Sequence, residues 1–257
     1  MGIEILLISI VCFVGSLLTF FSGFGLGTLL LPVFNLFFPI HLAIGMTAIV
    51  HFLNNAFKLG LMTKYIDWKM VRLFGFPAML GAFIGAIALK QITIQNQEIH
   101  FALLNMDFTN SLIKICIGSL LIVFSILELF QKSIKPITSS YWIIPGGLMS
   151  GFFGGLSGHQ GALRSIFLIR TSISKEAYIG TGIMIACLVD ISRISQYIQH
   201  IRNVDLNFYY ILIPCLAAFL GAWLGQKFLH KTTFPLLKYL VAFFLILFGL
   251  LLLLGII

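Results

Sequence analysis

Residues 20–27 read FFSGFGLG, a glycine-rich stretch inside an otherwise apolar segment. A similar stretch, FFGGLSGH, stands at residues 152–159. Each is followed by a further short apolar run, which ends near residue 38 in the first case and near residue 170 in the second. Glycine is unfavourable inside a helix, so each stretch predicts a break between two helices. The recurrence indicates that the chain contains two copies of one unit.

Further matches between the two copies follow in the same order along the chain. Each match is weak alone, but a shared order over about 115 residues per half is a strong sign of a repeat. Asn55 and Lys58 in the first copy correspond to Asp190 and Arg193 in the second. The other matched segments are 44–47 with 179–182 and 80–85 with 220–225.

The composition places both copies in a membrane. Of the 257 residues, 60% are hydrophobic and 9% are charged, and the mean hydropathy is +1.07. A soluble domain keeps about 25% charged residues to cover its surface, so this surface must face lipid. The formal charge of +8 does not indicate nucleic-acid binding, because Lys and Arg lie mostly in short loops between apolar segments and form no polybasic run.

The apolar runs are long enough for spanning helices, which need about 20 residues. Strands of a β-barrel would be shorter and alternating, so we predict an all-α polytopic membrane protein. Residues 1–5 carry no Lys or Arg and no cleavage site follows, so we expect the first segment to be retained. Residues 91–109 predict an extra polar loop. The predicted spans are 3–22, 41–63, 69–90, 110–131, 174–200, 206–229 and 234–256, with a Gly-broken stretch at 141–170.

The distribution of basic residues favours inverted repeats. If the Gly-broken segments 3–38 and 141–170 are re-entrant hairpins, each half crosses the membrane three times and the second half is inverted. Ten basic residues then face one side and three face the other, whereas single crossings would divide them six against seven. Because basic loops prefer the cytoplasm, we predict that the ten lie there and that both termini lie outside. The ten are Lys64, Lys69, Arg72, Lys132, Lys135, Arg170, Lys175, Lys227, Lys231 and Lys238, and the three are Lys90, Lys114 and Arg202.

Inversion would bring the two Gly-rich tips together near the middle of the bilayer. The helices that begin there, near Thr28 and Ala162, would present free backbone N–H groups and a positive dipole end, which attract anions. Broken helices on an inverted-repeat axis are where secondary transporters bind their substrates. We therefore predict two transmembrane repeats, 1–132 and 133–257, that form one integrated domain around a shared anion site.

Charged residues in the apolar segments also predict an anion site. Lys58, Arg164 and Arg193 lie within apolar segments, against the single acid Asp190. Intramembrane charges cost roughly 2.5–3.5 kcal/mol each and need partners. Asp190 and Arg193, three residues apart on one helix face, can pair, which leaves two cations for an anionic substrate. The alternatives are that Lys58 and Arg164 extend to the membrane surface and that the Asp190 pair is a structural clamp.

The predicted substrate-binding set draws on both tips and on the helices after them. We expect neither a metal nor a cofactor, because the four cysteines lie in apolar segments without CxxC spacing. His51 and His159 are either core histidines or proton-binding groups. The set comprises Ser22, Gly23, Gly25, Asn54, Asn55, Lys58, Ser157, Gly158, His159, Gln160, Arg164, Asp190 and Arg193.

Three segments carry a family resemblance over nearly the whole chain. They are FxSGFGLGxLLLP at 20–32, AxGMT at 43–47 with the Asn pair that follows it, and GFFGGLSGHQGALR at 151–164. Together they resemble the sulfite exporter TauE/SafE family, small permeases for sulfite and organosulfur anions. The resemblance implies a multi-pass protein of a bacterial-type inner membrane that moves a small anion by alternating access. Its partners would be the anion and the bilayer; whether it forms a homo-oligomer stays open.

Two other functions fit parts of the sequence. Gly155–Gly158 reads GxSG, and His51 with Asn55 reads HxxxN, as in rhomboid intramembrane serine proteases. The separate-helix histidine that such a nucleophile needs is missing, since His159 stands only two residues from Ser157. An anion channel is the second alternative, and it differs by needing no alternating access.

Overall fold

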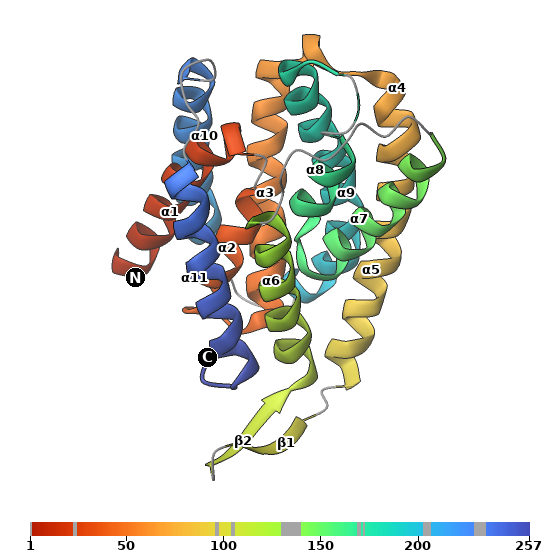
Figure 1. Ribbon diagram of the computed structural model, residues 1–257. Helices are drawn as coiled ribbons and strands as arrows, with labels where there is room; N and C mark the ends of the chain where they lie inside the picture. The colour runs from red at the N-terminus through yellow and green to blue at the C-terminus, as the bar shows by residue number, and fades with distance from the viewer. Residues whose placement is uncertain are drawn as a thin grey trace.

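The computed structural model describes residues 2–22, 25–95, 98–103, 106–129, 140–168, 171, 173–202, 207–228 and 235–257. These residues form a bundle of helices with one projecting β-hairpin (Figure 1). The first half contains α1 (Gly2–Ser22), α2 (Leu26–Asn35), α3 (Ile40–Met62), η1 (Thr63–Tyr65), α4 (Trp68–Met70), η2 (Val71–Gly75), α5 (Phe76–Gln95), β1 (Glu98–Leu103), β2 (Met106–Ser111) and α6 (Leu112–Leu129). The second half contains η3 (Ser140–Trp142), α7 (Ile143–Ser157), α8 (Gln160–Leu168), α9 (Lys175–Arg202), α10 (Tyr209–Phe228) and α11 (Pro235–Leu253).

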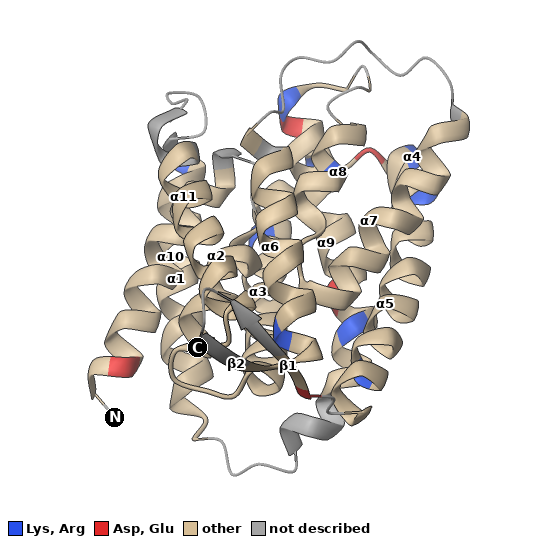
Figure 2. Cartoon of the chain, turned by 60° about the horizontal axis from the view of Figure 1, so that its bottom comes forward, with Lys and Arg blue, Asp and Glu red and all other residues tan. Residues whose placement is uncertain are grey.

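Five of the described helical segments are long and apolar enough to cross a membrane, which confirms a helical membrane fold. They begin at residues 2, 40, 68, 175 and 209. Figure 2 shows that few of the described helical residues are Lys, Arg, Asp or Glu. Large apolar side chains such as Phe243, Phe244 and Leu220 are about 60% exposed, as a surface in contact with lipid requires.

Both Gly-rich stretches interrupt helices, as predicted. The first break separates α1 from α2, and the second separates α7 from α8. Gly158 ends α7 with a φ of 81°, a left-handed conformation that glycine adopts without strain, and its N–H bonds back to the carbonyl of Gly154. Phe20, Leu26 and His159 are at most 2% exposed, so both breaks lie inside the bundle.

Helices of the first half pack mainly against helices of the second half. α1 packs along α10 and α7 packs along α5, so each broken segment lies against a helix of the other half. α3 packs on α9 and α6 on α11, which pairs corresponding elements. Figure 1 shows α2 returning to the end of the bundle where α1 begins, whereas α7 and α8 start and finish at the opposite end.

Small residues set the close approach of α7 to α5. Gly151 and Gly155 stand one turn apart on α7 and face backbone carbonyls of α5, and Gly147, one turn earlier, faces the carbonyl of Phe74 in η2. A Cβ at Gly151 would lie 1.8 Å from the carbonyl oxygen of Ala78. Only glycine permits this backbone contact, a common way to pack helices where no water drives association.

We expect Gly151→Ala to destabilise the protein by about 3 kcal/mol or more, because a backbone carbonyl cannot move aside as a side chain can. The measurement is the yield of monodisperse protein in detergent together with its melting temperature. Gly60→Ala is the matched control, since Gly60 is exposed on α3 and nothing lies within 4 Å of the added Cβ. Equal behaviour of the two variants would contradict the assigned α5–α7 packing.

The prediction of a polar loop at 91–109 is wrong, because the described residues of this segment form the end of a helix and a β-hairpin. α5 continues to Gln95, and Glu98–Leu103 (β1) pairs antiparallel with Met106–Ser111 (β2), with Glu98 opposite Ser111. The Asn110 amide donates to the carbonyls of Leu252 and Leu253 at 2.7 and 2.8 Å. It therefore bonds to carbonyls at the end of α11, where helical acceptors lack their usual partners, and this tertiary contact holds the hairpin in place.

Candidate functional site

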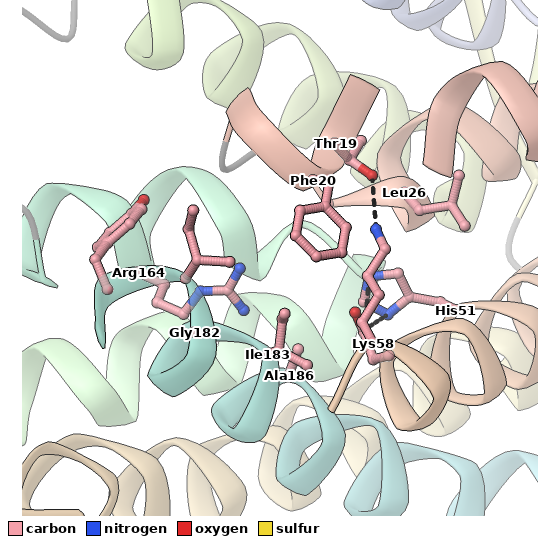
Figure 3. A pocket seen from close by; sticks show the side chains of 13 residues that line it. Thr19, Phe20, Leu26, His51, Lys58, Arg164, Gly182, Ile183 and Ala186 are labelled. Carbon is pink, nitrogen blue, oxygen red and sulfur yellow. Dashed lines mark hydrogen bonds between the residues drawn. The ribbon is translucent and has the colours of Figure 1, made fainter. Parts of the chain in front are cut away.

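A buried cavity lies beside the first helix break, between α3 and the start of α9. It offers about 40 Å³ to water-sized molecules, which is room for about three waters. Both halves of the chain contribute to its wall (Figure 3). The lining residues are Thr19, Phe20, Gly25, Leu26, His51, Asn55, Lys58, Arg164, Tyr178, Ile179, Gly182, Ile183 and Ala186.

Lys58 points into the bundle, so the alternative that it extends to the membrane surface is wrong. Its side chain is 3% exposed. The Nζ donates to the carbonyl of Ser16 at 3.2 Å and to Thr19 Oγ1 at 3.3 Å, and it lies 5.4 Å from the centre of the Phe20 ring. The last turns of α1 carry a partial negative charge, which stabilises a cation at this position. Lys58 therefore joins α3 to α1 at the cavity wall.

Arg164 reaches the same cavity from α8, in the other half of the chain. It is 9% exposed, which excludes an extension to the membrane surface. Gly182 of α9 makes room for the guanidinium, since a Cβ there would lie 3.4 Å from Arg164 Nε. Figure 3 shows Arg164 and Lys58 on opposite sides of the cavity, both directed toward it. Two cations, one from each half of the chain, thus line one small space.

Asp190 connects the cavity to the second helix break. Arg193 Nε donates to Asp190 Oδ1 at 2.9 Å, which confirms the predicted ion pair. The other carboxylate oxygen lies 2.7 Å from His51 Nδ1, a contact that the sequence did not reveal, and 3.4 Å from Asn55 Nδ2. Asp190 is fully buried, and His51 and Arg193 are 3% and 1% exposed. Its charge is therefore held between α3 and α9 and is not available to balance Lys58 or Arg164.

A family model for sulfite exporter TauE/SafE matches residues 7–252, nearly the whole chain. The chain belongs to the sulfite exporter TauE/SafE family. No curated protein and no solved structure matches the chain significantly. TauE/SafE proteins are membrane transporters, so this chain is a multi-pass transporter of the cell membrane and not an enzyme.

The local geometry agrees with TauE/SafE transport and not with the protease alternative. Ser157 Oγ donates to the carbonyl of Phe153 at 3.0 Å, and the histidine that contacts it, His159, lies at 3.0 Å in the same turn. His51 bonds to Asp190 instead. The described residues contain no group of three His, Cys, Asp or Glu side chains that could hold a metal ion.

The predicted site residues fall into separate groups in this TauE/SafE fold. Gly25, Asn55, Lys58 and Arg164 line the cavity. Asn54 does not; its amide contacts Ser16 Oγ at 2.8 Å, where α3 packs against α1. Gly23 and the side chain of Ser22 lie outside the described residues. None of the remaining six lines the cavity. Asp190 contacts the lining residues His51 and Asn55 from behind. The other five lie around the second break: Ser157, Gly158, His159, Gln160 and Arg193.

Several lining residues were absent from the predicted set. Thr19 and Phe20 end the first apolar segment, and the only sequence signal for them is a polar residue just before the glycines. Tyr178 and Gly182 lie on α9, and the match of 179–182 with 44–47 marks a repeat without indicating a cavity. Their role arises because α9 packs against α3 across the cavity, a contact between residues more than 100 positions apart.

Proposed function

We propose that this TauE/SafE transporter exports sulfite or a closely related organosulfur anion, held between Lys58 and Arg164. The observation that carries the proposal is that the two cations, one from each half of the chain, line one small cavity and face it from opposite sides, while Asp190 is bonded to His51 and Arg193. Positive side chains on both sides of a small cavity stabilise an anionic ligand between them. The small volume of the cavity favours an anion of few atoms over a long organic chain.

The proposed mechanism is alternating access between two inverted repeats, residues 1–132 and 133–257. Two observations support it. Each broken segment packs on a helix of the other half, α1 on α10 and α7 on α5. The two broken segments also enter the bundle from opposite ends (Figure 1). Repeats related in this way can exchange conformations, so that access to the interior opens first to one side and then to the other.

The proposed orientation places the loop between α3 and α5 in the cytoplasm and both termini outside. The bundle end that carries η1, α4 and the start of α9 bears Lys64, Lys69 and Lys175, as the preference of basic loops for the cytoplasm requires. The α9 residues that line the cavity, from Tyr178 to Ala186, belong to the first half of α9. On this orientation the cavity lies toward the cytoplasm, the side from which an exporter takes its substrate.

Export of an anion needs no coupling ion, because an inside-negative potential contributes about 2.3 kcal/mol per charge per 100 mV. We therefore expect purified protein in liposomes to move labelled sulfite outward faster when an inside-negative potential is imposed without a pH gradient. Flux should saturate with sulfite concentration, as alternating access requires and an open channel does not. Protein-free liposomes provide the control. Flux that ignores the potential but follows a pH gradient would reject the proposed driving force, and absence of sulfite flux would reject the substrate.

A further inference from the structure

A second polar cluster surrounds the break between α7 and α8, outside the cavity described above. His159 and Gln160 are each 1% exposed. His159 Nε2 and both polar atoms of the Gln160 side chain have no hydrogen-bond partner among the described residues. A buried polar group without a partner costs about 1–3 kcal/mol, and most buried polar groups in proteins are bonded. Three such atoms on adjacent residues indicate a place that is occupied in another state of the molecule.

Arg193 lies directly beside this break. Its Nη1 is 2.8 Å from the position that a Cβ on Gly158 would take, so the guanidinium rests against the backbone of the tip. The same face of α9 presents Val189 to Gly154 and the Tyr197 hydroxyl to the carbonyl of Gly155. Residues 189, 193 and 197 recur at helical spacing, so one face of α9 packs against the break between α7 and α8.

This arrangement corresponds to the cavity in the other repeat. The sequence aligns Lys58 with Arg193, and each cation lies next to the helix break of its own repeat. Beside Lys58 the structure has an open cavity, whereas beside Arg193 the helices are in contact. Along α9 the cavity residues precede Asp190, and Arg193 and Tyr197 follow it, toward the opposite end of the bundle (Figure 1). The two places therefore lie on opposite sides of Asp190.

The geometry points to a second anion site, formed by Arg193, Gln160 and His159, that opens to the outside after the cavity at Lys58 and Arg164 has closed. This inference rests on the proposed function, since inverted repeats exchange conformations as access alternates. Arg193 and the Gln160 amide nitrogen would donate to the oxyanion. The Gln160 amide oxygen accepts, and hydrogensulfite, an oxyanion that keeps one hydroxyl group, can donate to it. Opening the site requires the Tyr197–Gly155 bond to break.

The first test compares the two membrane sides in liposomes that contain protein of one orientation. Gln160→Leu should raise the sulfite concentration for half-maximal entry from the external side by about tenfold, because a hydrogen bond to a charged ligand is lost. The sulfite concentration for half-maximal transport from the cytoplasmic side should change by no more than about twofold, because a substitution away from a binding site has a small effect. Gln196→Leu is the matched control on α9, where the side chain is partly exposed and bonds to Ser195. Equal changes on both sides, or none, would overturn the second site while the proposed function stands.

A second measurement needs no sulfite flux. Gln160→Cys should react with a negatively charged, membrane-impermeant thiol reagent added from outside, at a rate above that of the unmodified protein with its native cysteines. His100→Cys, on the exposed part of β1, marks the external side. Tyr197→Phe should speed the reaction at residue 160, because it removes the bond that closes the tip. Reaction only from the cytoplasmic side, or from neither side, would overturn the site even if sulfite proves to be the wrong substrate.

Discussion

Arg164→Ala should reduce sulfite transport by about 10- to 100-fold. A hydrogen bond to a charged group contributes about 1.5–3 kcal/mol, and each 1.4 kcal/mol is about tenfold in affinity. The substitution also removes one of the two cations that line the cavity. The measurement is the initial rate of labelled sulfite efflux from proteoliposomes, read against sulfite concentration. The loss should appear as a higher half-saturating concentration on the cytoplasmic side.

Two variants separate binding from folding in this experiment. Arg164→Lys keeps a charge but loses the planar, forked set of donors, so it should retain intermediate activity. Arg72→Ala makes the same change on an exposed arginine of η2 and should leave transport unaltered. The melting temperature of Arg164→Ala should change far less than its transport rate. Normal transport by Arg164→Ala would place the anion elsewhere and remove the main support for the proposed site.

Asp190→Ala should give the largest loss of stability of any single charge removal among the described residues, about 3–5 kcal/mol. The reason is that it leaves Arg193 buried without its carboxylate and His51 without its bond partner. We expect a fall in melting temperature of roughly 10 °C in detergent, given the size of the chain. Glu98→Ala, an acid exposed on β1, should change the melting temperature by little.

A double variant tests whether the unpaired charge is the cause. Arg193→Gln in an Asp190→Asn background leaves neither partner charged, so part of the lost stability should return relative to Asp190→Asn alone. Such recovery is the expected coupling between residues in contact. Strictly additive losses would show that the two side chains act independently, contrary to their 2.8 Å contact.

The helical parts of the fold follow from local properties of the sequence, whereas the hairpin does not. Long apolar runs must form helices in a bilayer, since no water is present to satisfy the backbone. Glycines at both breaks mark where those helices end, and the spacing of Asp190 and Arg193 fixes their pairing on one helix face. Residues 91–109 read as a polar loop because a two-stranded hairpin is marginal alone. Its pairing depends on Asn110, which reaches the end of α11 far along the chain.

The cavity residues also divide into features that the sequence predicts and features that only packing decides. Lys58 and Arg164 were both identified from sequence as buried cations, yet sequence left open whether they extend to the membrane surface. The long side chain of Lys58 can turn either way, and the choice depends on the carbonyl of Ser16, which only the packing of α1 beside α3 supplies. The pairing of His51 with Asp190, 139 residues apart, likewise requires α3 to lie on α9.

The sequence by itself determined that this protein lies in a membrane, contains broken helices and concentrates positive charge in its interior. These properties follow from composition and from local spacing, which act within a few helical turns. Only the tertiary structure decided which cations share a cavity and which acid is already neutralised by a neighbour. The physical reason is that electrostatic contacts in a bundle act over a few ångströms, and only packing brings residues from opposite halves that close.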